Sequence, residues 1–217
     1  WVSMEVFLDG EPIASSGLLD EKGVLDPWSH MMNALVLDRE GNRIHERNVE
    51  DIFIALYNHQ IPPGAADSLH YRLDVPNAPG SKLTVRAKAL YRKFDTHFLS
   101  LFMDGERNDL PVVTLGEDEV TFVIGGPEIE VDIEESKPTW IRWNDYGIGM
   151  RRKGAKGAVR GELVTAISAF EEVTRLGRPD GAMNKARALI KAGRLDEAAL
   201  SLDKAAQHDP PPPPWSL

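Results

Sequence analysis

The spacing of apolar residues changes once along this chain, close to Pro138, and this change most constrains what the chain can fold into. Before Pro138, apolar side chains recur at every second residue, as in the run Leu83–Tyr91. After Pro138 they recur at every third or fourth residue, as in the run Leu163–Val173. A period of two gives a strand one apolar face, and a period of about 3.6 gives a helix one apolar face. The sequence therefore predicts a β region followed by an α region.

The β region, residues 1–136, is expected to be an antiparallel β-sandwich of immunoglobulin-like or related type, because turn residues separate several short apolar runs. Gly, Pro, Asn and Asp supply those turns, for example at Asp9-Gly10. Two apolar stretches, Val49–Tyr57 and Thr96–Met103, fit strands poorly and are expected to be short helices. The expected strands are Val2–Leu8, Met31–Leu37, Leu69–Val75, Leu83–Tyr91, Val120–Ile124 and Ile129–Ile133.

The α region, residues 137–217, carries one spacing pattern twice, with the second copy 32 residues after the first. In the later copy, small and bulky apolar residues follow a glycine and precede a proline, at intervals of five, four, three and five residues. Small residues are required where two helices cross closely, since a larger side chain would force them apart. The packing residues of the pattern are Ala166, Phe170, Ala186, Gly193, Ala198, Leu202, Ala205 and Pro210. This pattern resembles the tetratricopeptide repeat (TPR), a helical hairpin whose surface holds other proteins.

The resemblance to the tetratricopeptide repeat implies two helical hairpins. The earlier hairpin would begin with a helix over Trp140–Lys153, and a glycine-rich insertion over Lys153–Arg160 would lengthen its turn. Two repeats are fewer than the roughly three that a stable array needs. Either further repeats follow Leu217, or the pair packs against the β region. The run Pro210–Pro214 is expected to be a stiff spacer, with a proline-rich ligand for a recognition domain as the alternative.

Composition limits the functions that the chain can carry. The formal net charge of −9 argues against nucleic acid as a partner, because nucleic-acid binders present a basic stripe. The chain has no cysteine, so covalently attached haem c, iron–sulfur clusters and zinc–thiolate sites are excluded within these residues. No apolar run approaches the ~20 residues that span a bilayer. Because the chain opens on Trp1 in a strand-like run, we interpret it as a piece of a longer protein.

A second resemblance rests on motifs that occur in one order along the chain. These motifs are Leu25–His30, Leu37–Gly41, Tyr57–Ala66, Tyr91–Asp95 and Trp143–Gly149, followed by the helical repeats. Together they resemble the C-terminal part of secreted bacterial multihaem c-type cytochromes that carry tetratricopeptide repeats. The resemblance implies a periplasmic or extracellular location and an electron-transfer context. In that family the haem-binding C-x-x-C-H motifs would lie upstream of the residues in hand.

Six histidines are the candidate ligands for a haem iron. The best placed are His30 and His59, each close to a proline-containing turn, and each could be the distal axial ligand of a haem held elsewhere in the same protein. The favoured interpretation is that each imidazole instead hydrogen-bonds a loop carbonyl and orders its turn. The remaining histidines are expected on solvated strand faces, turns or helix surfaces, and they are His45, His70, His97 and His208.

The sequence contains no G-x-S-x-G elbow, no H-E-x-x-H helix and no phosphate-binding Walker loop. We therefore expect a non-catalytic scaffold and protein-interaction module of an exported multihaem electron-transfer protein, with a partner or a neighbouring copy bound by the repeats. One alternative is a structural protein that oligomerises through an exposed sheet edge. The other is an enzyme or a ligand- or carbohydrate-binding module that uses the sandwich loops around His30 and His59.

Overall fold

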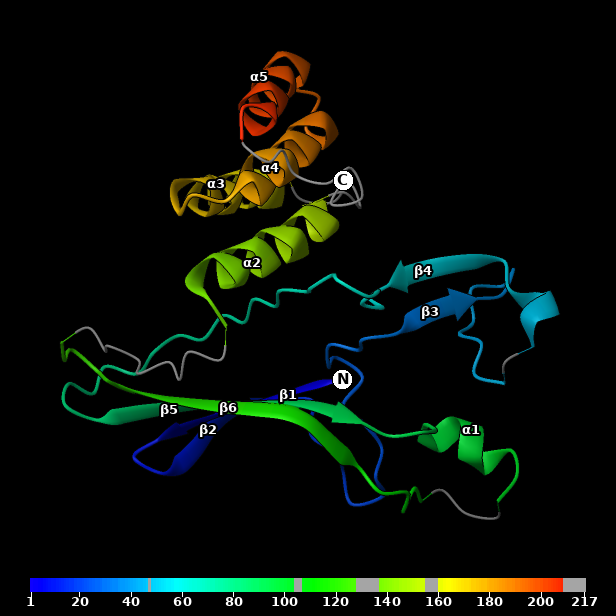
Figure 1. The fold of residues 1–217 in the computed structure, drawn as a ribbon. Helices are drawn as coiled ribbons and strands as arrows, with labels where there is room; N and C mark the ends of the chain where they lie inside the picture. Colours follow the sequence, from blue (N-terminus) through cyan, green and yellow to red (C-terminus); the bar gives the residue numbers. More distant parts are fainter. Residues whose placement is uncertain (47, 104–106, 128–136, 155–159, 209–217) are drawn as a thin grey trace. The chain divides into compact units, whose positions relative to one another are not determined.

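The computed structural model describes residues 1–46, 48–103, 107–127, 137–154 and 160–208 (Figure 1). The strands are β1 (Val2–Leu8), β2 (Glu11–Ser16), β3 (Ala34–Leu37), β4 (Ile54–Asn58), β5 (Lys82–Tyr91) and β6 (Val113–Val123). The helices are the 3-10 turn η1 (Val49–Asp51) and α1 (Thr96–Ser100), α2 (Thr139–Gly154), α3 (Arg160–Arg175), α4 (Pro179–Lys191) and α5 (Leu195–Ala206).

These elements form two compact units. The β unit contains Trp1–Gln60 and the chain from Arg72 through β6, and the helical unit contains Ile61–Tyr71 and helices α2 to α5.

The β unit is built on a four-stranded sheet with the order β2-β1-β5-β6, in which every neighbouring pair is antiparallel. Strands β3 and β4 form a second, two-stranded antiparallel sheet. The prediction of antiparallel β-structure followed by helices is therefore confirmed. The turn between β1 and β2 has positive φ at both Asp9 (51°) and Gly10 (94°), as a two-residue hairpin turn of the right twist requires.

The alternating pattern of β5 gives the larger sheet two chemically different faces. The apolar face carries the cross-strand rows Val6–Val85–Val120 and Leu8–Leu83–Phe122. The opposite face carries the charged rows Glu5–Arg86–Glu119 and Ser3–Lys88–Glu117. Within these rows the Arg86 guanidinium lies 2.7 Å from Glu119 and the Lys88 ammonium lies 3.3 Å from Glu117. The bases of β5 thus lie opposite the acidic middle of β6, an arrangement of unlike charges that is compatible with pairing of the two strands.

The predicted strand Leu69–Val75 is wrong, because this segment pairs with no strand among the described residues. The neighbouring Pro63 and Pro76 have no backbone N–H to donate to a ladder, which disfavours sheet pairing there. The first part of the segment belongs to Ile61–Tyr71, which packs in the helical unit. Alternating apolar residues therefore predicted a strand where the chain is an unpaired connection.

Two other expectations were met only in part. The stretch Val49–Tyr57, expected to be a short helix, begins with the turn η1 but continues as strand β4. The stretch Thr96–Met103 does contain the short helix α1, whose first turn is capped by the Asp95 carboxylate at 2.7 Å from the Phe98 amide. Strand β2 was not among the predicted strands, because its sequence has little apolar alternation. The predicted strand Ile129–Ile133 lies outside the described residues.

The helical unit has its core where successive helices cross: α2 packs on α3, α3 on α4 and α4 on α5. Helix α2 covers the residues predicted for the first helix of the earlier hairpin, and its Met150 is 1% exposed. The insertion predicted at Lys153–Arg160 lies mostly outside the described residues. The main core cluster contains Met150, Ala166, Ile167, Phe170, Ala186, Ala188, Leu189 and Ala198.

Two glycines of α2 let other parts of the helical unit approach it closely. A Cβ atom on Gly147 would lie 2.6 Å from the Phe170 ring of α3, so only glycine fits at this crossing without a shift. A Cβ atom on Gly149 would lie 2.5 Å from the Ser68 hydroxyl. Arg152 donates a hydrogen bond to the Ala66 carbonyl at 2.9 Å. The segment Ile61–Tyr71 is therefore seated directly on α2.

Candidate functional site

The residues of the repeat pattern that the structure describes lie on α3, α4 and α5 and in the turn between α4 and α5. Those that are at most 3% exposed are Ala166, Phe170, Ala186, Ala198 and Ala205. Gly193 follows α4 with a φ of 75°, the left-handed conformation that commonly ends a helix. Leu202 is 39% exposed on α5, because no helix follows α5 among the described residues to cover that side. Pro210 lies outside the described residues.

Helices α3, α4 and α5 together line a groove of about 580 Å³. Its cations are Arg175, Lys185 and Lys204, its carboxylates are Glu171 and Glu197, and its uncharged residues are Thr174, Ala182, Leu200 and Ser201. Both carboxylates are paired, Glu171 with Lys185 at 2.6 Å and Glu197 with Arg194 at 2.6 Å. Of the cations, Lys185 is thus also paired, and Arg175 pairs with Glu172 at 2.7 Å. The groove also offers an apolar contact, since Leu200 is 69% exposed. It therefore combines one uncovered leucine with a slight excess of positive charge.

The two histidines singled out from the sequence lie together in the β unit. The rings of His30 and His59 stack with centroids 4.7 Å apart and an interplanar angle of 13°. Tyr57 also stacks on His59, with a centroid distance of 4.4 Å and an interplanar angle of 15°. An imidazole lone pair lies in the plane of its ring, so two stacked rings cannot bind one iron between them. In this arrangement the pair cannot supply both axial ligands of a single haem.

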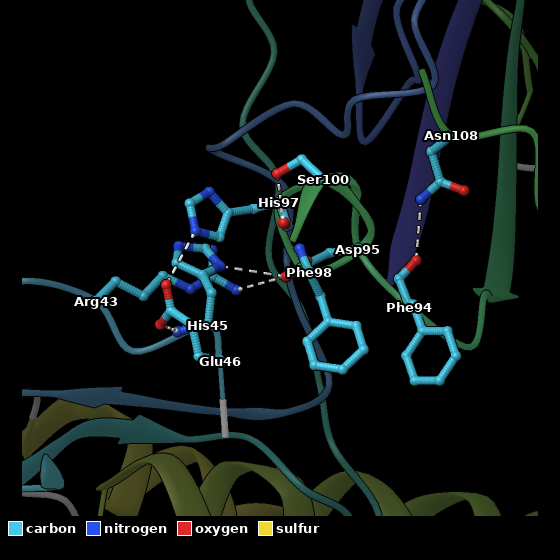
Figure 2. Close-up of polar contacts among 9 residues, drawn as sticks. All are labelled: Arg43, His45, Glu46, Phe94, Asp95, His97, Phe98, Ser100 and Asn108. Atoms are coloured by element: carbon cyan, nitrogen blue, oxygen red, sulfur yellow. Dashed lines mark hydrogen bonds and ion pairs between the residues drawn. The ribbon is translucent and has the colours of Figure 1, made fainter. Parts of the chain in front are cut away.

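A second histidine pair, assigned to exposed surfaces from the sequence, forms a polar cluster in the β unit (Figure 2). The rings of His45 and His97 lie 4.1 Å apart, tilted by 39°. His45 Nδ1 is 3.3 Å from an Asp95 carboxylate oxygen, and His97 Nε2 is 3.4 Å from a Glu46 carboxylate oxygen. Each histidine is thus paired with an acid that comes from the chain segment of the other histidine.

The loops that hold this cluster are fixed by hydrogen bonds that side chains make with the backbone and with each other. Asp95 both caps α1 and accepts from His45, so its position is set from two sides. The buried side chain of Asn108 donates to the Phe94 carbonyl at 3.0 Å, just before Asp95. The Gly23 carbonyl accepts hydrogen bonds from Arg92 and Thr96 at 2.7 and 3.1 Å. Three separate loops therefore position the Asp95 carboxylate.

The charge state of His45 follows from its surroundings. Burial, and then the neighbouring Arg43 guanidinium, lower the pKa of His45 below its ordinary value of 6.5, and the Asp95 carboxylate only partly offsets them. The ring is therefore neutral at pH 7. A carboxylate can only accept, so Nδ1 carries the proton and Nε2 is the acceptor nitrogen. A carboxylate-oriented neutral imidazole is suited to accept a proton or a hydrogen bond.

Sequence reasoning missed this cluster because its members are about fifty residues apart in the chain. The signal that could have found it is the pair of short motifs His45-Glu46 and Asp95-Thr96-His97, each with an acid beside a histidine. Within the part of the chain that the structure describes, no three His, Asp or Glu side chains are arranged to hold a metal ion.

Comparison with known proteins adds no relative. No family model matches the chain, and the searches of curated proteins and of solved structures return no match. In the described residues no helix combines the length and apolar character needed to cross a membrane. The lack of cysteine excludes covalent haem c attachment in this chain.

Proposed function

We propose that this chain is a non-catalytic scaffold and protein-interaction module of an exported, periplasmic or extracellular, multihaem electron-transfer protein. Its helical unit would act as tetratricopeptide-type hairpins. Any covalently bound haem would belong to another part of that protein, because the chain has no cysteine. The electron-transfer context and the location rest on the ordered motifs that resemble multihaem cytochromes.

The observation that carries the proposal is the groove formed jointly by α3, α4 and α5. Helices whose cores contain alanines at the crossings pack closely and leave a continuous surface on one side. An uncovered leucine beside lysine and arginine side chains suits a peptide that presents an apolar residue flanked by acids. The proposed partner is therefore an acidic protein segment or an acidic surface of a neighbouring copy.

The tetratricopeptide assignment is supported by the positions of the small residues. Ala186 on α4 and Ala198 on α5 are both buried, and Gly193 makes the turn between them. The immunoglobulin-like sandwich stays a prediction, with the four-stranded antiparallel sheet and the two-stranded sheet as the observations that agree with it.

Site-specific photocrosslinking in the native host tests the proposed function. A photoreactive residue at Leu200, in the groove, should crosslink to one discrete protein. The matched control is Val164 on α3, which is also exposed, at 58% against 69% for Leu200, but is not a groove residue. A discrete product at Leu200 only, lost when Lys185 and Lys204 are changed to Glu, supports the proposal. Equal labelling at both positions argues against a dedicated binding face.

A second candidate function, assembly through the sheet edge, is favoured by strand β6. This strand is 11 residues long and pairs only with β5 among the described strands. Glu117 and Glu119 disfavour pairing of β6 with β6 of another copy, because an antiparallel pair centred on Asp118 places these like charges opposite each other. Assembly would therefore pair β6 with a different strand of a neighbouring copy. Sedimentation velocity over a range of concentrations tests it, and a monomer at every concentration would exclude it.

A further inference from the structure

The β unit contains a cavity of about 520 Å³ that neither the helical groove nor the sheet edge uses. Its walls come from five parts of the chain: Trp1, the loop from Val24 to Leu35, the segment with Arg43 and His45, Tyr57 of β4, and the segment from Leu90 to Phe98. Its volume falls within the range of about 300–1,000 Å³ typical of small-molecule sites. The histidine cluster of Figure 2 forms part of this wall, through His45, Asp95 and His97.

Much of the cavity wall is apolar and polarizable. Its apolar side chains include Met31, Met32, Leu35, Tyr57, Phe94 and Phe98. The Phe94 and Phe98 rings stack with centroids 4.8 Å apart, which fixes the orientation of this aromatic wall. Aromatic rings and methionine side chains favour contact with a flat apolar or aromatic body.

The charged groups of the cavity wall differ in how many hydrogen-bond and ion-pair partners they already have. Both carboxylates are in use: Asp26 accepts from the Gly17 and Trp28 amides, and Asp95 accepts from the Phe98 amide and from His45. Arg43, by contrast, has five N–H donors, and among the described residues its ion pair is to Asp95 at 3.8 Å, longer than a hydrogen bond. The guanidinium therefore keeps donors for a ligand, while the carboxylates have little left to offer a cation.

The net charge of the wall has the opposite sign to that of the whole chain. Its permanently charged groups are three cations, Arg43, Arg92 and Lys93, against two carboxylates, while the chain as a whole has a net charge of −9. A positive site in an acidic protein favours a small anion over a cation. The neutral His45 ring adds a hydrogen-bonding group beside Arg43 without adding charge.

We propose that this cavity binds a small organic anion with a flat apolar body. The body lies against the methionine and aromatic wall, and its carboxylate or sulfonate group is held by the Arg43 guanidinium. An acidic head on an apolar body matches both halves of the wall, and the two oxygens of a carboxylate, or two of the three oxygens of a sulfonate, match the fork of the guanidinium. This site is independent of the helical groove, so each can be present without the other.

The test uses two probes of nearly the same shape, anilinonaphthalene sulfonate and its uncharged parent phenylnaphthylamine, titrated into the full chain by fluorescence. Arg43→Gln should weaken binding of the sulfonate by about tenfold or more and leave the neutral probe nearly unchanged. Arg39→Gln is the control, because Arg39 is an exposed arginine of the same unit that is not part of the cavity wall. It should change neither affinity. Equal losses of both probes in Arg43→Gln, or the same effect in Arg39→Gln, would overturn the proposal.

Two measurements on the unaltered chain keep the proposal testable if the Arg43 variant does not fold. Raising sodium chloride from about 0.05 M to about 0.5 M should weaken the sulfonate and not the neutral probe, because salt screens the charge contact. The imidazole NMR signals of His45 should shift when the sulfonate binds, whereas those of the exposed His208 should not. Absence of saturable sulfonate binding, or binding that leaves the His45 signals in place, would also reject the site.

Discussion

Gly147 and Gly161 lie in successive helices and differ in the space beside the missing Cβ atom. At Gly147 that space is filled by the Phe170 ring at 2.6 Å, whereas at Gly161 nothing lies within 4 Å. We expect Gly147→Ala to lower the free energy of unfolding by about 1–3 kcal/mol through overpacking. We expect Gly161→Ala to raise it by up to about 1 kcal/mol, because alanine favours the helix. Urea unfolding followed by circular dichroism measures both, and effects of equal sign would contradict the close crossing.

The lowered pKa of His45 predicts how stability depends on pH. The folded state disfavours the charged ring, so the unfolded state binds more protons once the pH falls below the ordinary value of 6.5. Stability should therefore decline as the pH falls from about 6.5 toward the lower, folded-state pKa, and this decline should be weaker in His45→Gln. His208→Gln, at an exposed site, should keep the decline. An NMR titration midpoint for His45 above 6.5 would contradict the prediction.

The sequence predicted buried alanines better than it predicted the histidine cluster. The burial of Ala166 and Ala186 follows from local helical spacing, which a short window of sequence contains. The contact of His45 with Asp95 depends on two loops that meet only in the folded β unit. The proximity of His30 and His59 was likewise not visible in the sequence, although both residues were singled out individually.

At the scale of elements, α2 is packed on two sides: α3 contacts it at Gly147, and the segment Ile61–Tyr71 contacts it at Gly149. A Cβ atom on Gly149 would come within 2.8 Å of the Ser68 backbone nitrogen as well as the hydroxyl, so the segment must move to accept it. We expect Gly149→Ala to speed amide hydrogen exchange in Ile61–Tyr71, with β5 unchanged. Gly161→Ala serves as the control, and unchanged exchange in the segment would show that it is held by other contacts.

The prediction of strands failed where apolar residues alternate but no neighbouring strand pairs with the segment. Strands β1 and β5 were predicted from alternating apolar residues, and the prediction was right because these segments pair with each other in the sheet. The same alternation at Leu69–Val75 occurs in a chain that pairs with no described strand. A period of two reports which side chains share a face, but it contains no information on whether a neighbouring strand is present.

At the scale of the whole molecule, the helical unit is discontinuous in sequence, because Ile61–Tyr71 is separated from α2 by two strands of the larger sheet. A fragment from Thr139 to His208 should therefore be less stable than the helical unit of the full chain. Each kcal/mol lost should lower its melting temperature by about 4–8 °C. A synthetic peptide of residues 61–71 should restore part of the loss, and a scrambled peptide should not. A fragment that melts at the same temperature as the helical unit of the full chain would show that the segment contributes nothing.

The discontinuity also sets the order of events during synthesis. The ribosome releases Ile61–Tyr71 before any residue of α2, with roughly seventy residues still to be made between them. At about 5–20 residues per second this delay is on the order of 3–15 s, far longer than a helix needs to form. Throughout that interval the segment lacks its helical surface and is available to chaperones and proteases. A synonymous change that slows translation before α2 would thus affect the yield of folded protein without altering a single residue.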